Sequence, residues 1–467
     1  MQRESAVSIL KVLSPRIGTC MERVHLLNLG CPKNQVDGEL MLGALARAGF
    51  EVSLNPQEAE ILIVNTCSFI EAAKKESLDA ILEAASLKES ANARRVVVAG
   101  CLAQRYGQEL KAAMPEVDVL VGTGNFLDLP GLLRRPAEED RTQAVAYPGA
   151  AHLLASAESP RLLTGAPWTT YVKVSEGCDH RCAFCIIPKI RGRHQSRPLD
   201  DVVAEVRKLA ERGVREVNLV AQDLTAYGRD LYPRTSLAAL LRALAPIPNL
   251  RWIRLLYCYP NFVTCELLDA IAEVPQVVNY IDMPLQHADD RMLRAMRRER
   301  SVSALRSLLD RVRSKLPGLV LRTSFIVGFP GEDDQAFSHL VDFVREQRFD
   351  RVGVFTYSRE EGTAAYDLPD QIPQRVKLQR RRELMATQAQ VSWAKHQALV
   401  GTEIEVLIES EGPTERARLR GRSSSQAPEI DGAVFLRGMA KAGEFVRARV
   451  EQAFTYDLHA RIVETVT

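Results

Sequence analysis

Short apolar runs alternate with helix-like stretches over the first quarter of the chain. Apolar residues recur at helical spacing over 36–48 and 70–87, and each of these stretches lies between two apolar runs. The runs are residues 24–29, 61–64 and 96–99, with 117–121 as a further candidate strand. Alternation of strands and helices is typical of a parallel sheet with helices on its faces. We therefore expect an open parallel α/β domain over residues 23–134.

Residues 164–395 repeat this alternation six times. The predicted strands are 171–175, 216–221, 252–257, 278–283, 319–327 and 351–357. The helical patterns are 199–212, 237–245, 262–273, 302–316 and 334–346, and a long one over 374–398 closes the segment. A complete TIM barrel has eight strand–helix units. Six units predict a partial, TIM-like (βα)6 barrel.

The final segment, residues 396–467, has a different pattern. Charged and apolar residues alternate over 403–408 and 446–451, which is a strand signature. A stretch rich in Gly, Ser and Pro, 421–432, predicts a long loop between strands. We expect a small antiparallel β-barrel here.

Two segments show no sustained periodicity. Residues 135–163 predict a linker between the first two domains. Residues 1–22 predict a tail ahead of the first strand. Met21 directly precedes that strand, so Met1 and Met21 are both candidate native starts, and the sequence leaves the choice open.

Composition narrows the class of protein. Lys and Arg total 61 against 59 Asp and Glu in 467 residues, so the balance gives no support to non-specific phosphate binding. Apolar residues make up 46%, enough for several cores. Nine cysteines are too few for a disulfide scaffold and odd in number, which favours reduced thiols and a cytoplasmic location. No apolar run approaches the roughly 20 residues of a membrane span, so we expect no membrane contact.

Three cysteines stand within eight residues, at the spacing Cys-x-x-x-Cys-x-x-Cys: Cys178, Cys182 and Cys185. Thiolates hold iron–sulfur clusters, and three of them leave one iron of a four-iron cluster open. Inert core cysteines and a zinc site are the alternatives. A structural zinc site usually shows two Cys-x-x-Cys pairs or a closed Cys/His set. His180 is a possible fourth ligand but lies between two of the thiolates.

Three further cysteines each follow a predicted strand of the first domain: Cys31, Cys67 and Cys101. In an open parallel sheet, ligands bind beyond the carboxyl ends of the strands. These thiols are therefore expected to converge into a second three-thiolate site, the alternative being three unrelated core cysteines. Gly30 and Gly100 let the backbone pack closely there. Cys258 and Cys265 belong to neither set and are expected to be packing residues.

The loop around Cys178 resembles the radical S-adenosylmethionine (SAM) superfamily, including the aromatic Phe184 before its last cysteine. In that superfamily the open iron chelates SAM, and an electron then breaks a C–S bond to give a 5′-deoxyadenosyl radical. The whole order of domains resembles the radical SAM methylthiotransferases, whose terminal barrel is a TRAM domain. The chain resembles the type that acts on a ribosomal protein, in residues 30–34, 65–70, 100–106, 176–182, 284–288 and 427–432.

This resemblance implies a transferase that adds a methylthio group to the β-carbon of one aspartate in ribosomal protein S-twelve of the small subunit. It implies two 4Fe–4S clusters, one for each cysteine set, with one SAM as methyl donor and another as radical source. A tRNA methylthiotransferase modifying an adenosine near the anticodon is the alternative. The tRNA enzymes typically carry Cys-Gln-Met-Asn where this chain has Cys-Pro-Lys-Asn from Cys31 to Asn34. Residues 401–467 carry 11 acidic and 9 basic residues, a net of −2, whereas an RNA-holding barrel is normally basic.

The resemblance also implies contacts with SAM and with partners. Phe184, Gln222, Gln286 and Gly328 are the expected SAM-binding residues, with Gln222 near the amino end and Gly328 near the ribose and adenine. Plain turns or structural hydrogen bonds are the alternative roles for the last three. No catalytic residue is expected beyond the cluster ligands. The expected partners are an electron donor such as flavodoxin or ferredoxin and a sulfur donor, and the chain is expected to be a monomer.

Overall fold

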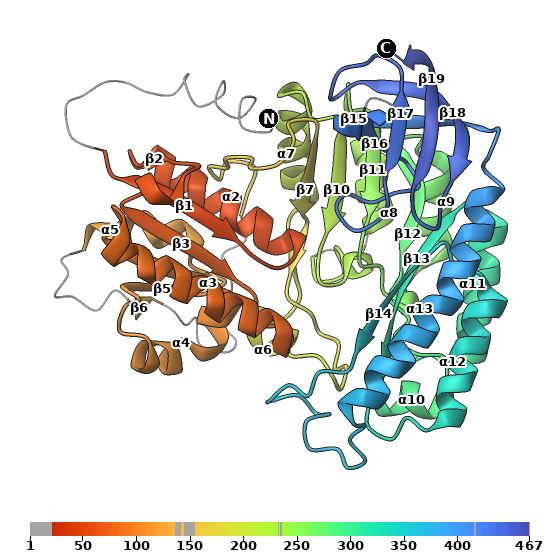
Figure 1. Cartoon of the computed structure of the whole chain (residues 1–467), viewed down its shortest axis with the longest axis horizontal. Helices are drawn as coiled ribbons and strands as arrows, with labels where there is room; N and C mark the ends of the chain where they lie inside the picture. The colour runs from red at the N-terminus through yellow and green to blue at the C-terminus, as the bar shows by residue number, and fades with distance from the viewer. Residues whose placement is uncertain are drawn as a thin grey trace.

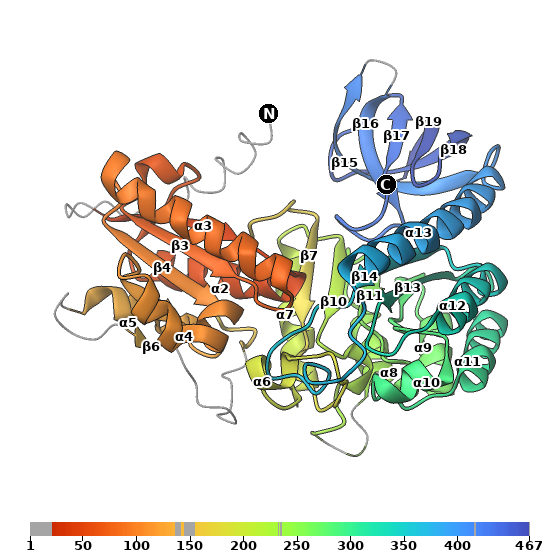
Figure 2. The ribbon, with the colours of Figure 1, turned by 60° about the horizontal axis from the view of Figure 1, so that its bottom comes forward.

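The computed structural model describes residues 21–135, 142–143, 155–231, 233, 236–414 and 417–466. Figures 1 and 2 show an N-terminal sheet with its helices beside a larger central sheet, and a small barrel that packs on the central sheet. Residues outside these ranges include Met1, nearly all of the expected tail and much of the expected linker. The choice between Met1 and Met21 as the native start therefore stays a prediction.

The N-terminal sheet contains parallel strands in the order β2-β1-β3-β4-β5-β6. The strands are β1 (Arg23–Asn28), β2 (Glu51–Val52), β3 (Ile61–Thr66), β4 (Arg95–Gly100), β5 (Val119–Val121) and β6 (Thr142–Gln143). The helices are α2 (Pro32–Arg47), α3 (Glu71–Ser90), α4 (Cys101–Ala113) and α5 (Leu129–Arg134), with short η1 (Pro56–Glu58) and η2 (Phe126–Asp128). Strands β2 and β6 were not predicted, because two residues are too few to show a period.

Both faces of this sheet are buried, as a parallel sheet covered by helices requires. On β3, Ile61 and Ile63 pack in one apolar cluster, while Leu62 and Val64 pack in another on the opposite face. The strand signal is therefore a continuous apolar run, as the sequence shows.

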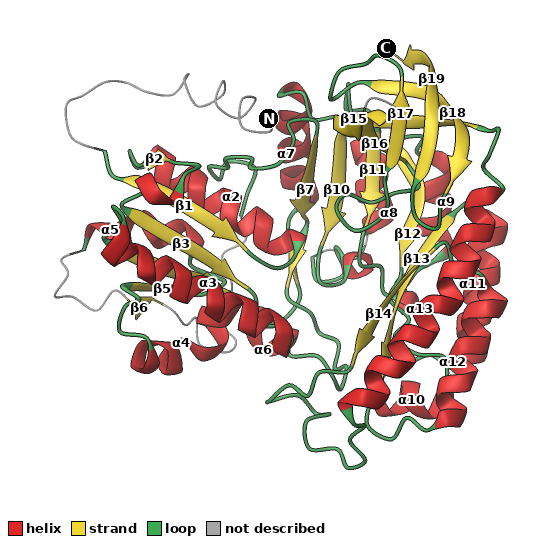
Figure 3. Cartoon of the chain, viewed as in Figure 1, coloured by secondary structure: helices red, strands yellow, loops and turns green. Residues whose placement is uncertain are grey.

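The central sheet is also parallel, and its strands follow chain order: β7-β10-β11-β12-β13-β14. They are β7 (Thr169–Lys173), β10 (Glu216–Val220), β11 (Trp252–Leu255), β12 (Val277–Asp282), β13 (Val320–Val327) and β14 (Arg351–Thr356). The larger helices are α7 (Leu199–Glu211), α8 (Leu237–Leu244), α9 (Cys265–Glu273), α11 (Val302–Lys315), α12 (Asp334–Gln347) and α13 (Gln374–Gln397). This progressive order is that of a partial (βα)6 barrel, which confirms the prediction (Figure 3).

Several short elements of the central part were not predicted. They are β8 (Ser175–Glu176), β9 (Gln195–Ser196), α6 (Ile187–Arg191), α10 (Asp290–Ala295), η3 (Leu224–Ala226) and η4 (Pro260–Phe262). Two of them matter for the site, because α6 follows the three-cysteine loop and β8 leads into it.

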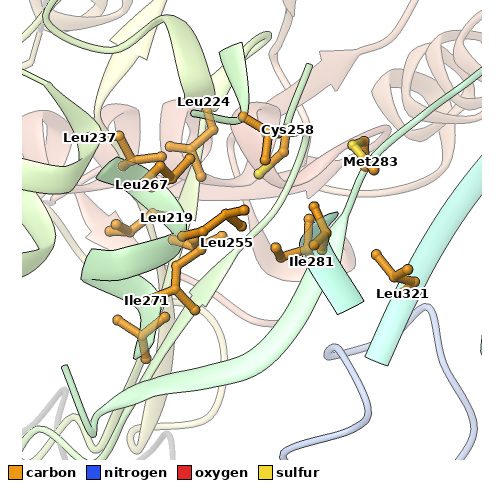
Figure 4. Packing of buried hydrophobic residues seen from close by; sticks show 14 of the residues in the cluster. Leu219, Leu224, Leu237, Leu255, Cys258, Leu267, Ile271, Ile281, Met283 and Leu321 are labelled. Carbon is orange, nitrogen blue, oxygen red and sulfur yellow. The ribbon is translucent and has the colours of Figure 1, made fainter. Parts of the chain in front are cut away.

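The main core lies between the central strands and their helices (Figure 4). Leu219, Leu255 and Ile281 come from successive strands and pack in one cluster with Cys258. Cys258 is 1% exposed, as expected for a packing residue. The same expectation is wrong for Cys265, whose side chain is exposed at the start of α9.

The terminal segment forms a closed barrel in the order β15-β16-β17-β19-β18. Its strands are β15 (Glu403–Thr414), β16 (Ala417–Ser423), β17 (Val434–Arg437), β18 (Phe445–Ala453) and β19 (Leu458–Val466). The barrel was predicted as antiparallel, but β17 and β19 pair in parallel, which closes it. The expected loop over 421–432 is shorter than predicted, since β16 continues to Ser423.

One apolar cluster joins all three parts. Val220 and Tyr280 of the central strands pack there with Leu40 of α2 and Leu407 of β15. The face of the central sheet opposite the main core is thus covered by the N-terminal part and by the terminal barrel. Among the described helices, none combines the length and apolar character that crossing a membrane requires.

Candidate functional site

Cys31, Cys67 and Cys101 lie at the carboxyl ends of three adjacent strands. Cys31 caps α2 just after β1, Cys67 follows β3, and Cys101 begins α4 directly after β4. A Cβ added to Gly30 would stand 2.9 Å from Cys67 Cβ, so the chain segments around these thiols are in close contact. The pKa of Cys101 is raised to about 12, chiefly by burial; the charge of Arg191 opposes the rise, and the neighbouring Cys67 and Cys31 add to it. The three thiols are brought together at the edge that the topology predicts.

Cys178, Cys182 and Cys185 lie on one loop after β8. The pKa values of Cys178 and Cys185 are both raised to about 12, chiefly by burial and in part by the neighbouring Cys182 thiol. The loop is held by backbone hydrogen bonds, from Cys178 N to Gly192 O at 3.1 Å and from Cys185 N to Cys182 O at 3.1 Å. These three thiols are therefore neighbours as well.

The two thiol sets lie on facing parts of the molecule. Cys101 packs against Ile186 and Ile190, and Ile186 is the residue after Cys185. The Thr123 hydroxyl of the N-terminal part also donates to Ile190 O at 3.2 Å, which adds a hydrogen bond to this apolar contact. The end of the N-terminal sheet thus meets the three-cysteine loop of the central part.

Arg191, at the end of α6, connects the two sets. Its guanidinium donates to Cys101 Sγ at 3.2 Å and to Glu176 Oε2 at 3.3 Å. Glu176 stands two residues before Cys178. Arg191 is 2% exposed, and a buried charge persists only where partners compensate it.

Buried acids supply that compensation. Asp37 of α2 accepts from Arg191 at 2.7 Å and from Lys173 of β7, and Lys173 also donates to Glu176 at 2.6 Å. Burial by itself raises the pKa of Glu176, but the charges of Lys173 and Arg191 outweigh it and hold that pKa below its usual value. Glu176 therefore stays ionised at neutral pH, and the network joins the N-terminal part to the central strands.

Some buried polar atoms at the site have no partner within the described residues. They include Ser68 Oγ, beside Cys67, and Gln222 Oε1, at the carboxyl end of β10. The amide nitrogen of Gln222 donates to Glu176. A buried polar atom without a partner costs free energy, so these two oxygens are available to a bound molecule.

The other residues predicted for SAM stand around the same strand ends. Phe184 is half-buried and packs on a cluster that includes Met296. Gln286 adopts a left-handed φ of 77° and pairs through its backbone with β13. At Gly328 an added Cβ would stand 2.3 Å from Lys377 Cγ, so the close approach found there is to α13.

His180, the possible fourth ligand, contacts side chains outside both thiol sets. Its Nε2 lies 2.6 Å from Asp223 Oδ2, and its ring stacks on Tyr259 with centroids 3.7 Å apart. Among the described residues, no three His, Cys, Asp or Glu side chains are close enough to hold a single metal ion. A four-iron cluster differs, because each thiolate binds a separate iron and the sulfurs stand further apart.

Sequence reasoning missed Asp37, Glu176 and Arg191. No spacing could have revealed them, because Arg191 and Asp37 are 154 residues apart in the chain. An Arg or Asp in an amphipathic stretch is normally on a solvated face, and only the tertiary structure shows these three to be buried.

The fold and the site define a class of protein: a radical SAM enzyme with an additional N-terminal thiol site and a terminal barrel. Residues 23–122 match the family described as uncharacterized protein family UPF0004. Residues 172–344 match the radical SAM superfamily, and residues 400–463 match the TRAM domain.

Curated relatives extend this match to nearly the whole chain. The ribosomal protein uS12 methylthiotransferase RimO of Myxococcus xanthus (strain DK1622) is 48% identical over 96% of this chain and 93% of its own length. Proteins of the same name from Anaeromyxobacter sp. (strain K) and Geotalea uraniireducens (strain Rf4) are 49% and 47% identical, over 94% and 95% of this chain and 93% and 98% of their own. The chain belongs to the RimO family of ribosomal protein uS12 methylthiotransferases.

Solved structures support the fold. TsrM from Kitasatospora setae, a radical SAM methyltransferase solved with tryptophan substrate and a SAM analogue, has a TM-score of 0.54 at 14% identity. The match covers 80% of this chain and 90% of that one. At this identity the likeness concerns the arrangement of the chain alone.

Proposed function

We propose that the protein adds a methylthio group to the β-carbon of an aspartate in ribosomal protein uS12. The curated relatives named for this activity align with about 95% of the chain. The observation that carries the proposal is the pair of three-thiol sets, which meet where Cys101 packs against Ile186 and are joined through Arg191.

The six thiols suit two 4Fe–4S clusters. All six are free, they are grouped three and three, and Gly30 leaves out the Cβ that would crowd Cys67. In this proposal Cys31, Cys67 and Cys101 hold the first cluster, and Cys178, Cys182 and Cys185 hold the second. When bound, the clusters and SAM supply the one-electron chemistry and the methylated sulfur that the reaction needs.

The chemistry of the substrate explains why such cofactors are required. A β C–H bond of aspartate has no useful acidity, so a general base of the protein cannot activate it. The protein's own residues instead bind, orient and exclude water. Arg191 keeps Cys101 in place, and Gln222 offers a free oxygen beside Glu176 to the ammonium group of SAM. Phe184, Gln286 and Gly328 complete the proposed SAM site.

The proposal also covers the partners of the protein and its cellular location. A net charge of −2 on residues 401–467 suits a basic ribosomal protein. We infer an electron donor such as flavodoxin or ferredoxin, a separate sulfur donor, a monomer and a cytoplasmic location. We also propose the divisions of the chain at residues 23–134, 164–395 and 396–467.

Single cysteine variants test the assignment. We expect about eight irons per chain in the anaerobically reconstituted protein. Cys31→Ala should lower the iron content by about half and abolish methylthiolation but leave SAM cleavage intact, because the second set is unchanged. Cys182→Ala should abolish SAM cleavage. Cys265→Ala is the matched control, since Cys265 is exposed and outside both sets, and it should change neither activity.

Mass spectrometry of a deletion strain tests the substrate. Loss of the methylthio group from uS12 is the expected result. Loss of a methylthio group from tRNA with uS12 unchanged would favour the tRNA enzyme instead. Methylthiolation by Cys31→Ala at the wild-type rate would refute the role of the first set.

A further inference from the structure

A cleft of about 460 Å³ opens on the surface beside the loop of Cys178, Cys182 and Cys185. Its walls come from that loop and from α10 with the turn after it. The lining residues are Asp179, Arg181, Arg294, Arg297, Arg298 and Glu299. A backbone hydrogen bond from Ala183 N to Met296 O, 2.9 Å long, ties the two walls together. We call this feature the arginine cleft.

The arginine cleft carries positive charge that the described residues do not neutralise. Its two acids are engaged by other groups: Asp179 pairs with Arg193 at 3.2 Å, and Glu299 accepts from Asn261. Arg181, Arg294 and Arg297 are exposed, and among the described residues they have no ion-pair partner. The cleft is lined by four arginines and by two acids that already have partners. Its net positive charge attracts an acidic partner.

Arg298 connects the cleft to the proposed second cluster. Its Nη1 lies 3.6 Å from Cys182 Sγ, and its Nη2 donates to Pro284 O at 2.8 Å. The same guanidinium lies 4.1 Å from the ring centroid of Tyr259. Arg298 therefore lines the cleft and also contacts a thiol of the Cys178, Cys182 and Cys185 set.

We propose that the arginine cleft is the docking surface for an acidic one-electron carrier protein, which holds a flavin or an iron–sulfur centre. This inference rests on the proposed function, in which each SAM cleaved requires one electron from outside. The carrier is oxidised by one electron, and the cluster held by Cys182 and its neighbours is reduced by one. The basic ribosomal substrate would be repelled by the arginines, so the same cleft does not suit it.

Charge reversal at the rim tests the proposal. Arg294→Glu/Arg297→Glu changes two exposed residues that contact neither thiol set, and Arg381→Glu/Arg382→Glu makes the same change on the exposed face of α13. Binding of flavodoxin to each anaerobically reconstituted enzyme is measured by calorimetry at low and high salt. We expect the cleft pair to weaken binding by about tenfold or more at low salt, since like charges then face each other. The α13 pair should bind as the wild type does.

Two chemical assays separate the possible results. With dithionite as reductant, SAM cleavage and uS12 methylthiolation by the cleft pair should match the wild type, whereas flavodoxin-driven cleavage should fall. Failure of methylthiolation with dithionite in the wild type would refute the proposed function and not the docking surface. Equal flavodoxin affinity in wild type and cleft pair would overturn the docking proposal, and so would a wild type that binds neither flavodoxin nor ferredoxin. A cleft pair that lost affinity for the small ribosomal subunit but kept its affinity for flavodoxin would also overturn the docking proposal, because it would indicate an RNA contact.

Discussion

At the scale of single residues, two glycines with the same backbone conformation have different surroundings. Gly30 and Gly49 both have a φ of +94°, which residues with a Cβ rarely adopt. At Gly49 an added Cβ would meet nothing within 4 Å, whereas at Gly30 it would meet Cys67 Cβ at 2.9 Å and its Sγ at 3.3 Å. Gly30 is therefore required by the space beside the thiols as well as by the turn.

Gly30→Ala should selectively damage the first thiol set. The new methyl group would displace Cys67, so we expect iron content to fall by about half and methylthiolation to be lost, with SAM cleavage retained. Gly49→Ala is the matched control, because it adds the same backbone strain without the contact. Iron analysis and a SAM-cleavage assay measure the effect. Equal iron loss in both variants would show that strain alone is responsible.

At the scale of elements, a buried ion cluster attaches the terminal barrel to the central sheet. Glu216 of β10 accepts from Arg254 of β11 at 3.2 Å and from Arg422 Nη1 of β16 at 3.0 Å. Burial alone raises the pKa of Glu216, but the charges of Arg422 and Arg254 outweigh it and hold that pKa below 4.5. One buried, ionised carboxylate thus contributes to the contact between these two domains.

Glu216→Gln should destabilise the folded protein by about 3–5 kcal/mol at pH 7, because it leaves Arg254 buried without a counter-charge and leaves Arg422 with Glu409 alone. The folded-state pKa of Glu216 is lowered, so its stabilising effect is present above pH 4.5 and is lost as the pH falls through the folded pKa. The difference in unfolding free energy between wild type and variant should therefore shrink in acid.

Glu409→Gln is the control for this prediction. Glu409 binds the same Arg422 at 2.5 Å, but its side chain is 21% exposed, so its loss should cost about 1 kcal/mol. Denaturant titration followed by tryptophan fluorescence measures both, since Trp252 lies edge-on to Phe445 of the terminal barrel at 4.8 Å. A difference between wild type and Glu216→Gln that does not change with pH would contradict the ionic explanation.

At the scale of the whole molecule, the segment before β7 binds the N-terminal part to the central part. Arg161 donates to Glu39 of α2 at 2.7 Å and to Glu205 of α7 at 2.7 Å. Glu39 is only 1% exposed. Part of the segment predicted as a linker therefore holds two domains together.

Arg161→Gln should uncouple SAM cleavage from methylthiolation of uS12. Without the guanidinium, the buried Glu39 loses its cationic partner, and we expect the alignment of the thiol sets to loosen. The number of SAM molecules cleaved per methylthiolated uS12 should rise several-fold, while iron content stays unchanged. Arg242→Gln, which removes the exposed pair with Glu273 at 2.9 Å, should leave this ratio as in the wild type. An unchanged ratio in Arg161→Gln would show that other contacts set the alignment.

The sequence by itself determined the succession of strands and helices and the two groups of cysteines. Both follow from local rules: hydrophobic period identifies each long element, and parallel strands bring residues at their carboxyl ends to one edge. Elements of two residues, such as β2 and β6, are too short for any period and were missed.

Only the tertiary structure decided which charges are buried and where the domains meet. Arg191 with Asp37, Arg422 with Glu216 and Arg161 with Glu39 join residues 154, 206 and 122 positions apart. The parallel pairing of β17 and β19 and the arginine cleft likewise arise from segments brought together by folding. The physical reason is that periodicity reports the environment along one element, whereas a buried ion pair depends on which distant element arrives opposite it.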